Sequence, residues 1–133
     1  ALGSEGLTEY DLDQFRFLVG DGVSVLFQRA VPCLNEDPAL AARLMQTYHA
    51  AYSRSWNIRS KPYDGILEML QRLDDCKMPK AVLSNKPQAF TSKCVQHYFG
   101  TYRLDPILGQ REGVARKPDP VGVYEIASVW NLS

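Results

Sequence analysis

A short apolar run in the second half of the chain is followed at once by polar and cationic side chains, and this transition constrains the fold more than any other feature. The run spans residues 81–83, and Ser84-Asn85-Lys86 comes directly after it. Apolar strands without alternation are typical of parallel sheets, which are covered on both faces. Ligands bind beyond the carboxyl ends of such strands. The sequence therefore predicts an α/β fold with a ligand site at Ser84 and Asn85.

Helical and strand patterns alternate along the sequence after Ser60. The predicted order is a helix opened by residues 62–65, a strand over Lys80–Leu83, a helix from Pro87 to Gly100, a strand over Pro106–Gly109 and a helix after Asp119-Pro120. Alternation of this kind requires crossover connections and a parallel sheet. Because two strands do not form a stable open sheet alone, we expect residues 61–133 to be part of a larger α/β domain.

Residues 1–60 show helical spacing only. Helices are predicted over Glu9–Val19, over Val23–Ala30 and from Pro38 to about Trp56. The last of these has a clear start, since Asp37 can cap the helix and proline suits its first position. We therefore expect an all-helical domain over residues 1–60, followed by the α/β domain over residues 61–133.

A second cationic segment supplies a partner for Ser84. The segment 116–120, with the sequence RKPDP, puts Lys117 on a loop just before the last predicted helix. A hydroxyl, backbone amides and an ammonium that converge near helix N-termini favour a phosphoryl group, because they offer hydrogen-bond donors and positive charge. Ser84, Asn85, Lys86 and Lys117 are therefore the predicted phosphate-binding residues. Taken singly, each is an ordinary turn residue or surface charge, so the prediction depends on their combination.

The charge and the cysteine content exclude several classes of partner. Fifteen basic residues balance fifteen acidic ones, whereas a nucleic-acid-binding surface needs a basic stripe. No apolar run approaches the ~20 residues of a membrane-spanning helix. Cys33, Cys76 and Cys94 are odd in number and show no CxxC spacing, which is typical of reduced thiols in the cytoplasm. We expect a cytoplasmic protein that binds neither nucleic acid nor membrane.

Several of these segments resemble the motifs of a known superfamily. Leu83–Pro87 and Arg116–Pro120 are similar to motifs two and three of the haloacid dehalogenase (HAD) superfamily, most of whose members are phosphatases. Val19–Gly22, followed by Val25–Ala30, resembles the helical cap of bacterial phosphoglycolate phosphatases, and Leu108–Gly113 is also similar to those enzymes. The resemblance covers nearly the whole chain. It implies a partial Rossmann-like core with parallel strands and an N-terminal helical cap.

The resemblance also implies a reaction. In this superfamily an aspartate attacks phosphorus to form an aspartyl-phosphate, a second aspartate acts as general acid and base, and Mg²⁺ offsets the repulsion between carboxylate and phosphate. Ser84 would then bind the transferred phosphoryl group and Lys117 would supply the catalytic cation. Asn85 and Lys86 would flank the site, with Asn85 acting through its backbone. The implied substrate is a small phosphorylated metabolite, most directly 2-phosphoglycolate.

The helical cap would close over the core, exclude water and choose the substrate. Lys61-Pro62 would form one of the two hinges between cap and core. Arg29, Arg54 and Arg59 are candidates for binding a substrate carboxylate, although a surface charge is the simpler interpretation of each.

Two motifs of the superfamily are not found in this sequence. The first is an apolar strand that ends in DxDGT. Asp11-Leu12-Asp13 has the DxD letters, but it lies in an amphipathic helical pattern, so carboxylates at a helix start explain it better. The second, an acidic pair that completes the Mg²⁺ site, would fall beyond Ser133. We therefore expect a fragment with its nucleophile and metal ligands outside the chain and no activity alone.

Other functions fit the same residues. A haloacid dehalogenase attacks carbon with the same aspartate, and Leu83-Ser84-Asn85 fits that branch, while Lys86 and Gln110–Gly113 fit the phosphatases better. A sugar-phosphate mutase is a further alternative. In a non-catalytic HAD-like binding module, the lysines would only hold an anion. The unpaired sheet edge and the apolar helix faces could also join two copies into a homo-oligomer.

Overall fold

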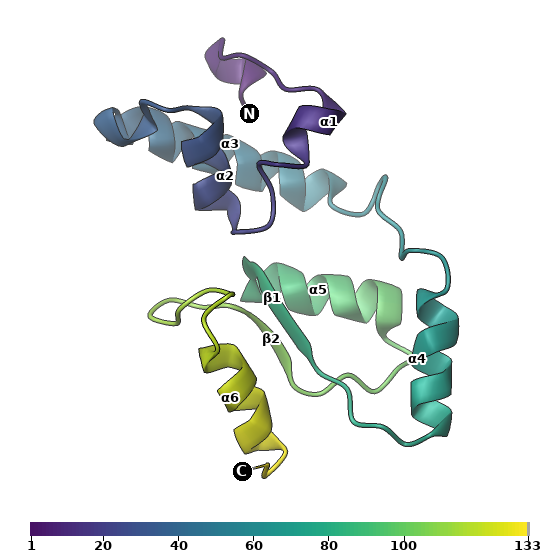
Figure 1. Ribbon diagram of the computed structural model, residues 1–133. Coiled ribbons are helices and arrows are strands. Elements are labelled where there is room, and N and C mark those ends of the chain that lie inside the picture. The colour runs from purple at the N-terminus through teal and green to yellow at the C-terminus, as the bar shows by residue number, and fades with distance from the viewer. Residues whose placement is uncertain (133) are drawn as a thin grey trace. The chain divides into compact units, whose positions relative to one another are not determined.

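The structure is a computed structural model that describes residues 1–132, and it divides into two compact units. The first unit is Ala1–Ser60 and the second begins at Lys61 (Figure 1). Within residues 1–132, no helix combines the length and the apolar character that crossing a bilayer requires.

The described elements of the first unit are all helical. They are η1 (Gly3–Glu5), α1 (Leu12–Phe15), α2 (Val23–Ala30), η2 (Leu34–Glu36) and α3 (Pro38–Ser55). Helix α2 begins and ends where the spacing predicts. Helix α3 begins at Pro38 because the Asp37 carboxylate accepts a hydrogen bond from the Leu40 N–H at 2.9 Å and so caps the first turn.

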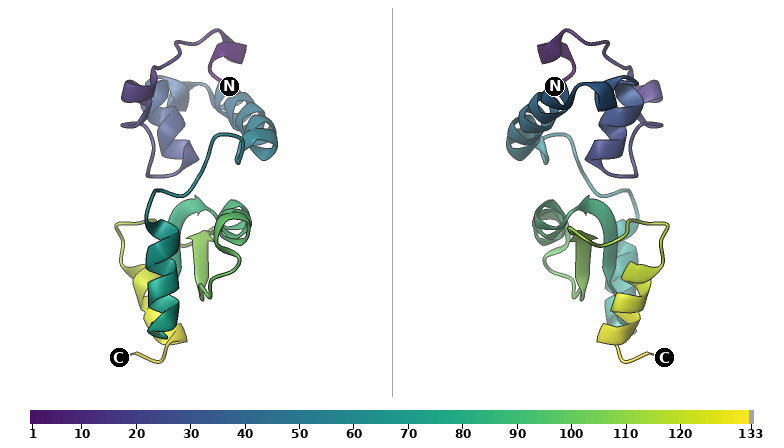
Figure 2. Two further views of the ribbon diagram at one scale, coloured as in Figure 1. Left: turned by 90° about the vertical axis from the view of Figure 1, so that its right-hand side faces the viewer. Right: turned by 90° about the vertical axis from the view of Figure 1, so that its left-hand side faces the viewer.

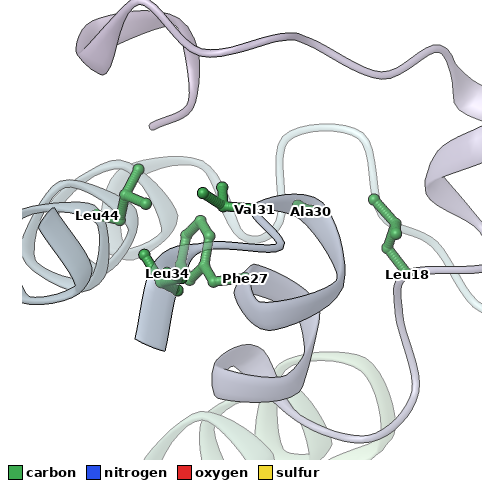
Figure 3. Packing of buried hydrophobic residues seen from close by; sticks show 6 residues of the cluster. All are labelled: Leu18, Phe27, Ala30, Val31, Leu34 and Leu44. Atoms are coloured by element: carbon green, nitrogen blue, oxygen red, sulfur yellow. The ribbon is translucent and has the colours of Figure 1, made fainter. Parts of the chain in front are cut away.

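A small apolar core holds α2, η2 and α3 together (Figure 3). Leu44 of α3 is fully buried, and Phe27 of α2 and Leu34 of η2 are nearly so. The ring of Tyr48 meets that of Phe27 edge-on, with centroids 5.9 Å apart, which extends the packing along α3. Burial of this kind, more than intrinsic helix propensity, stabilises short helices.

The helix predicted over Glu9–Val19 is wrong in its length, because the structure forms only the single turn α1. Asp11 starts this turn as its cap: its carboxylate accepts from the Gln14 N–H at 2.8 Å, and the Gln14 side chain accepts from the Asp11 N–H. Leu12 and Phe17 are 90% and 71% exposed. Leu18 does join the core, but its apolar neighbours in the segment stay exposed, so the spacing forms no continuous buried face that would stabilise a longer helix.

The second unit has the predicted α/β architecture. Its elements are α4 (Ile66–Asp75), β1 (Val82–Pro87), α5 (Gln88–Phe99), β2 (Ile107–Gln110) and α6 (Val121–Val129). The two strands pair in parallel, which confirms the predicted fold class. Helix α5 covers one face of this sheet, while α4 and α6 lie on the other face (Figure 2).

The first strand differs from its predicted extent. It begins at Val82, later than expected, and it continues to Pro87, which was predicted to open the next helix. The pairing is regular at Leu83 opposite Leu108 and resumes only at Pro87 opposite Gln110. Four steps along β1 thus match two along β2, so β1 carries two extra residues in a bulge. Bulges re-aim side chains and are frequent beside functional sites.

Candidate functional site

The bulge in β1 carries Ser84, Asn85 and Lys86 out of the regular ladder. Ser84 and Asn85 line a small hollow together with Lys117, which comes from the loop before α6. The remaining lining residues belong to the carboxyl end of the sheet, to the loop after β2 and to α6; they are Leu83, Gly109, Gln110, Arg111, Val114, Ala115, Asp119 and Gly122. The structure thus brings three of the four predicted site residues to one place.

Ser84 is half-buried and its hydroxyl is held by the bulge itself. Its Oγ accepts a hydrogen bond from the Lys86 N–H at 3.1 Å. A hydroxyl that accepts in this way keeps its own hydrogen to donate to a ligand oxygen. Lys86 therefore contributes through its backbone, and the lining of the hollow within residues 1–132 does not include it. Its N–H, expected to bind phosphate directly, is already engaged with Ser84.

Lys117 reaches back across the end of β1. Its Nζ donates to the Leu83 carbonyl oxygen at 2.8 Å. The Val82 N–H points to β2, where it donates to the Pro106 carbonyl, and adjacent residues of a strand point their backbone groups to opposite sides. The Leu83 carbonyl therefore faces away from β2, one residue before Ser84. An ammonium has three hydrogens, so this bond leaves capacity for an anion.

Asn85 acts through its side chain, and this differs from the expectation that it acts through its backbone. Its Oδ1 accepts from the Lys117 N–H at 2.8 Å and its Nδ2 donates to the Lys117 carbonyl at 3.1 Å. Asn85 is also only 8% exposed. One buried amide thus joins β1 to the backbone of a residue 32 positions later. The sequence shows no signal for this contact, because an asparagine after a strand is common in turns.

A second amide braces the end of β2. Gln88 at the start of α5 donates from Nε2 to the Ile107 carbonyl at 3.0 Å and accepts from the Gly109 N–H at 2.6 Å. Gly109 must be glycine here, because a Cβ would lie 2.6 Å from the Gln88 Cα and 2.8 Å from the Lys86 carbonyl oxygen. This close approach fixes β2 against the bulge that carries Ser84.

An ion pair that the sequence analysis missed ties the Lys117 loop to α6. Both terminal nitrogens of Arg111 donate to the carboxylate of Glu125, each at 2.6 Å. The hydrogen bond from Arg111 lowers the pKa of Glu125, and the same bond raises the pKa of Arg111. Two-point pairing of this kind orients the guanidinium as well as binding it. It therefore limits the movement of the loop between Arg111 and Lys117.

Replacing Glu125 with glutamine should lower the melting temperature of the protein by a few degrees at neutral pH. The pKa of Glu125 is lowered in the folded state, so its stabilising contribution is present above the pKa that it has in the unfolded chain. That contribution is lost as the pH falls through the folded-state value. Melting curves from pH 7 down to the acidic limit should show wild type and Glu125→Gln converging at low pH. A difference that stays constant with pH would contradict the ionic character of this pair.

The described residues do not form a site for Mg²⁺. Within residues 1–132, no group of three or more histidine, cysteine, aspartate or glutamate side chains is placed to hold a metal ion. Asp11 is engaged as the cap of α1, and Asp13 lies near Arg16, with both side chains exposed. The polar side chains at the hollow are a hydroxyl, two amides, a guanidinium, an ammonium and the single carboxylate of Asp119. Hydrogen-bond donors and positive charge predominate, which suits an anion better than a hard cation.

Comparisons with known proteins agree with this arrangement. Residues 1–132 match the family described as haloacid dehalogenase-like hydrolase. The chain is 29% identical over 126 residues to a phosphoglycolate phosphatase of Thiobacillus denitrificans, covering 92% of this chain and 55% of that protein. It is 30% identical over 122 residues to a phosphoglycolate phosphatase of Mesorhizobium japonicum, covering 90% of this chain and 54% of that protein. The chain therefore spans little more than half the length of these relatives.

A solved structure shows the same fold. The crystal structure of a protein from Haemophilus somnus, described as a predicted phosphoglycolate phosphatase, superposes with a TM-score of 0.88 at 21% sequence identity. The match covers 98% of this chain and 61% of that chain. At this identity the likeness supports the fold and adds nothing on substrate.

Proposed function

Because the chain belongs to the haloacid dehalogenase-like hydrolases, we propose that the intact protein is a phosphatase and that residues 61–132 supply the phosphate-binding part of its active site. One observation carries this proposal: Ser84 and Lys117, distant in sequence, line one hollow at the carboxyl end of a parallel sheet. That is the place where open α/β sheets bind their ligands.

The chemistry of these two residues suits a phosphoryl group in transfer. The Ser84 hydroxyl can donate to one phosphoryl oxygen, and the Lys117 ammonium can place positive charge beside another. Donors fixed in advance stabilise the charge that spreads over these oxygens, because they need no rearrangement during the reaction. The Leu83 carbonyl and the Asn85 amide hold Lys117 in this position from two sides.

We assign the attacking aspartate and the Mg²⁺ ligands of this reaction to sequence outside the chain. The described residues offer no acidic cluster at the hollow, and the relatives extend well beyond the matched part. In this proposal the chain binds and orients the phosphoryl group, and the aspartyl-phosphate would form on an aspartate outside it.

For the substrate we propose 2-phosphoglycolate, which the names of the two curated relatives support. The helical unit Ala1–Ser60 would act as the cap that closes over the site. Arg29 already pairs with Asp21 within this unit, so Arg54 and Arg59 are the better candidates for the substrate carboxylate. The three cysteines form no disulfide within residues 1–132, which fits a reducing compartment such as the cytoplasm.

A panel of substrates tests the proposal on the intact protein with Mg²⁺. We expect phosphate release, with the highest kcat/KM for 2-phosphoglycolate among small phosphate monoesters. Halide release from 2-haloacids would identify a dehalogenase, and phosphoryl transfer between sugar positions without phosphate release would identify a mutase. Binding of phosphate without turnover of any of these compounds would identify a non-catalytic module.

The isolated 133-residue chain should not hydrolyse phosphate esters, whether or not Mg²⁺ is added. The reason is that the one carboxylate among the lining residues of the hollow, that of Asp119, accepts a hydrogen bond from the Val121 N–H at 2.9 Å at the start of α6. We therefore expect it to hold the loop and not to attack phosphorus, and no metal-binding cluster lies within residues 1–132. The measurement is phosphate release by the isolated chain beside the intact protein at equal concentration. Turnover that depends on Mg²⁺ and disappears in Lys117→Ala would show that the chain carries a nucleophile of its own.

A further inference from the structure

Asn85 is one of two buried polar residues among the described side chains, with Thr91 the other. Burying an amide costs free energy unless its hydrogen bonds are made. Here the amide makes two hydrogen bonds to one distant residue: it accepts from the N–H of Lys117 and donates to the C=O of Lys117. This pairing copies the two-bond contact that two residues make in a sheet, so it fixes both the position and the direction of the Lys117 backbone.

The Lys117 side chain begins at the residue that Asn85 holds, and it ends on the Leu83 carbonyl, two residues before Asn85 in β1. The loop that leads from β2 to Lys117 is also restrained, because the Gln110 Nε2 donates to the carbonyls of Arg111 and Val114 at 2.8 and 2.7 Å. The Asn85 amide is the point where this restrained loop is joined to the strand that carries Ser84. Without it, nothing described in residues 1–132 ties the Lys117 backbone directly to β1.

We propose that Asn85 is a positioning residue, whose buried amide sets the place of the Lys117 ammonium relative to the Ser84 hydroxyl. This inference rests on the proposed function for its catalytic consequence. Its structural part rests on the two hydrogen bonds between the Asn85 side chain and the Lys117 backbone. It departs from the expectation that Asn85 binds the substrate, because the amide reaches the phosphoryl group only through Lys117.

The test uses the intact protein and three variants. Asn85→Ala removes both bonds to Lys117. Asn85→Asp keeps the acceptor for the Lys117 N–H and loses the donor to the Lys117 carbonyl. It replaces Asn85→Ala in the test if the alanine variant folds poorly. Tyr102→Phe is the control, because it removes a hydrogen bond from a side chain to a distant backbone carbonyl, that of Leu67, in the same unit and away from the hollow.

We expect Asn85→Ala to lower kcat on 2-phosphoglycolate by about 10²-fold, since small misplacements of a catalytic group have effects of this size. KM should change little, the kcat of Asn85→Asp should fall between those of wild type and Asn85→Ala, and Tyr102→Phe should keep most of its kcat. In a Lys117→Ala background, Asn85→Ala should have almost no further effect, because residues that act through one another are not additive. Losses that multiply independently in the double variant would overturn the proposal.

Hydrogen exchange separates this inference from the proposed function. The Lys117 amide should exchange faster in Asn85→Ala than in wild type, and its exchange rate should be unchanged in Tyr102→Phe. If the wild-type protein hydrolyses no phosphate ester, the proposed function fails, and the same variants are then compared by their Kd for inorganic phosphate. The positioning role would still be supported if Asn85→Ala raised the Kd for phosphate in the wild-type background and had no such effect in the Lys117→Ala background. Equal phosphate binding or an unaltered Lys117 amide would refute it.

Discussion

Replacing Lys117 with alanine is expected to lower the kcat of the intact protein by on the order of 10²–10³-fold, because a donor fixed beside the transferring group contributes this much to the rate. The side chain is exposed, and its Nζ donates a hydrogen bond to the Leu83 carbonyl. Exposed side chains seldom change the free energy of unfolding by more than ~0.5 kcal/mol. The loss should therefore appear in catalysis and leave the urea unfolding midpoint almost where it was.

A lysine on the same unit serves as the control for this experiment. Lys93 is exposed on α5 and does not line the hollow, so Lys93→Ala removes the same charge without removing a donor from the site. Its kcat should stay close to that of wild type. If Lys117→Ala also stays within about twofold, a difference that corresponds to a small fraction of one transition-state contact, the role given to Lys117 is wrong.

The fold could be predicted where the signal is local. The apolar run before Ser84 and the spacing of α2, α3 and α5 lie within single segments of sequence, and the parallel pairing follows from their alternation. The same reasoning predicts that Ser84 and Lys117 approach each other, because residues after strands and before helices gather at one edge of a parallel sheet. The structure puts both on one hollow.

The remaining features depend on contacts between distant segments. The bond from Asn85 to Lys117 spans 32 positions and the pair between Arg111 and Glu125 spans 14. No local pattern in the sequence identifies the partner of the Asn85 amide or of the Arg111 guanidinium. The bulge in β1 depends on how Pro87 pairs with β2, and the periodicity of one strand carries no information about its register with another.

The short helix α1 shows the opposite failure, in which a local pattern is present and the structure does not use it. Apolar residues recur at helical spacing through Phe17 and Leu18, yet Leu18 is nearly buried while Phe17 stays exposed. A periodic pattern predicts a helix only if one face has a surface to cover. Prediction from spacing is therefore most reliable for segments such as α3, whose apolar face meets a core.

The same core accounts for the largest stability effect that we expect. Leu44 is fully buried within the cluster of the first unit, so Leu44→Ala should lower the free energy of unfolding by about 2–5 kcal/mol, through lost burial and the cavity left behind. Urea denaturation of the intact protein measures this loss, and hydrogen exchange shows in which unit protection is lost. Protection should fall mainly in Ala1–Ser60, where the cluster lies, and less around Asn85 and Lys117.

The chain provides a matched control for Leu44→Ala in Leu12, which is 90% exposed on α1. Leu12→Ala removes the same atoms from a side chain that buries almost nothing, so it should change the free energy of unfolding by less than ~0.5 kcal/mol. The contrast between the two variants isolates burial from composition and from helix propensity. If both variants unfolded at the same urea concentration, the cluster around Leu44 would not be the core that stabilises the helical unit.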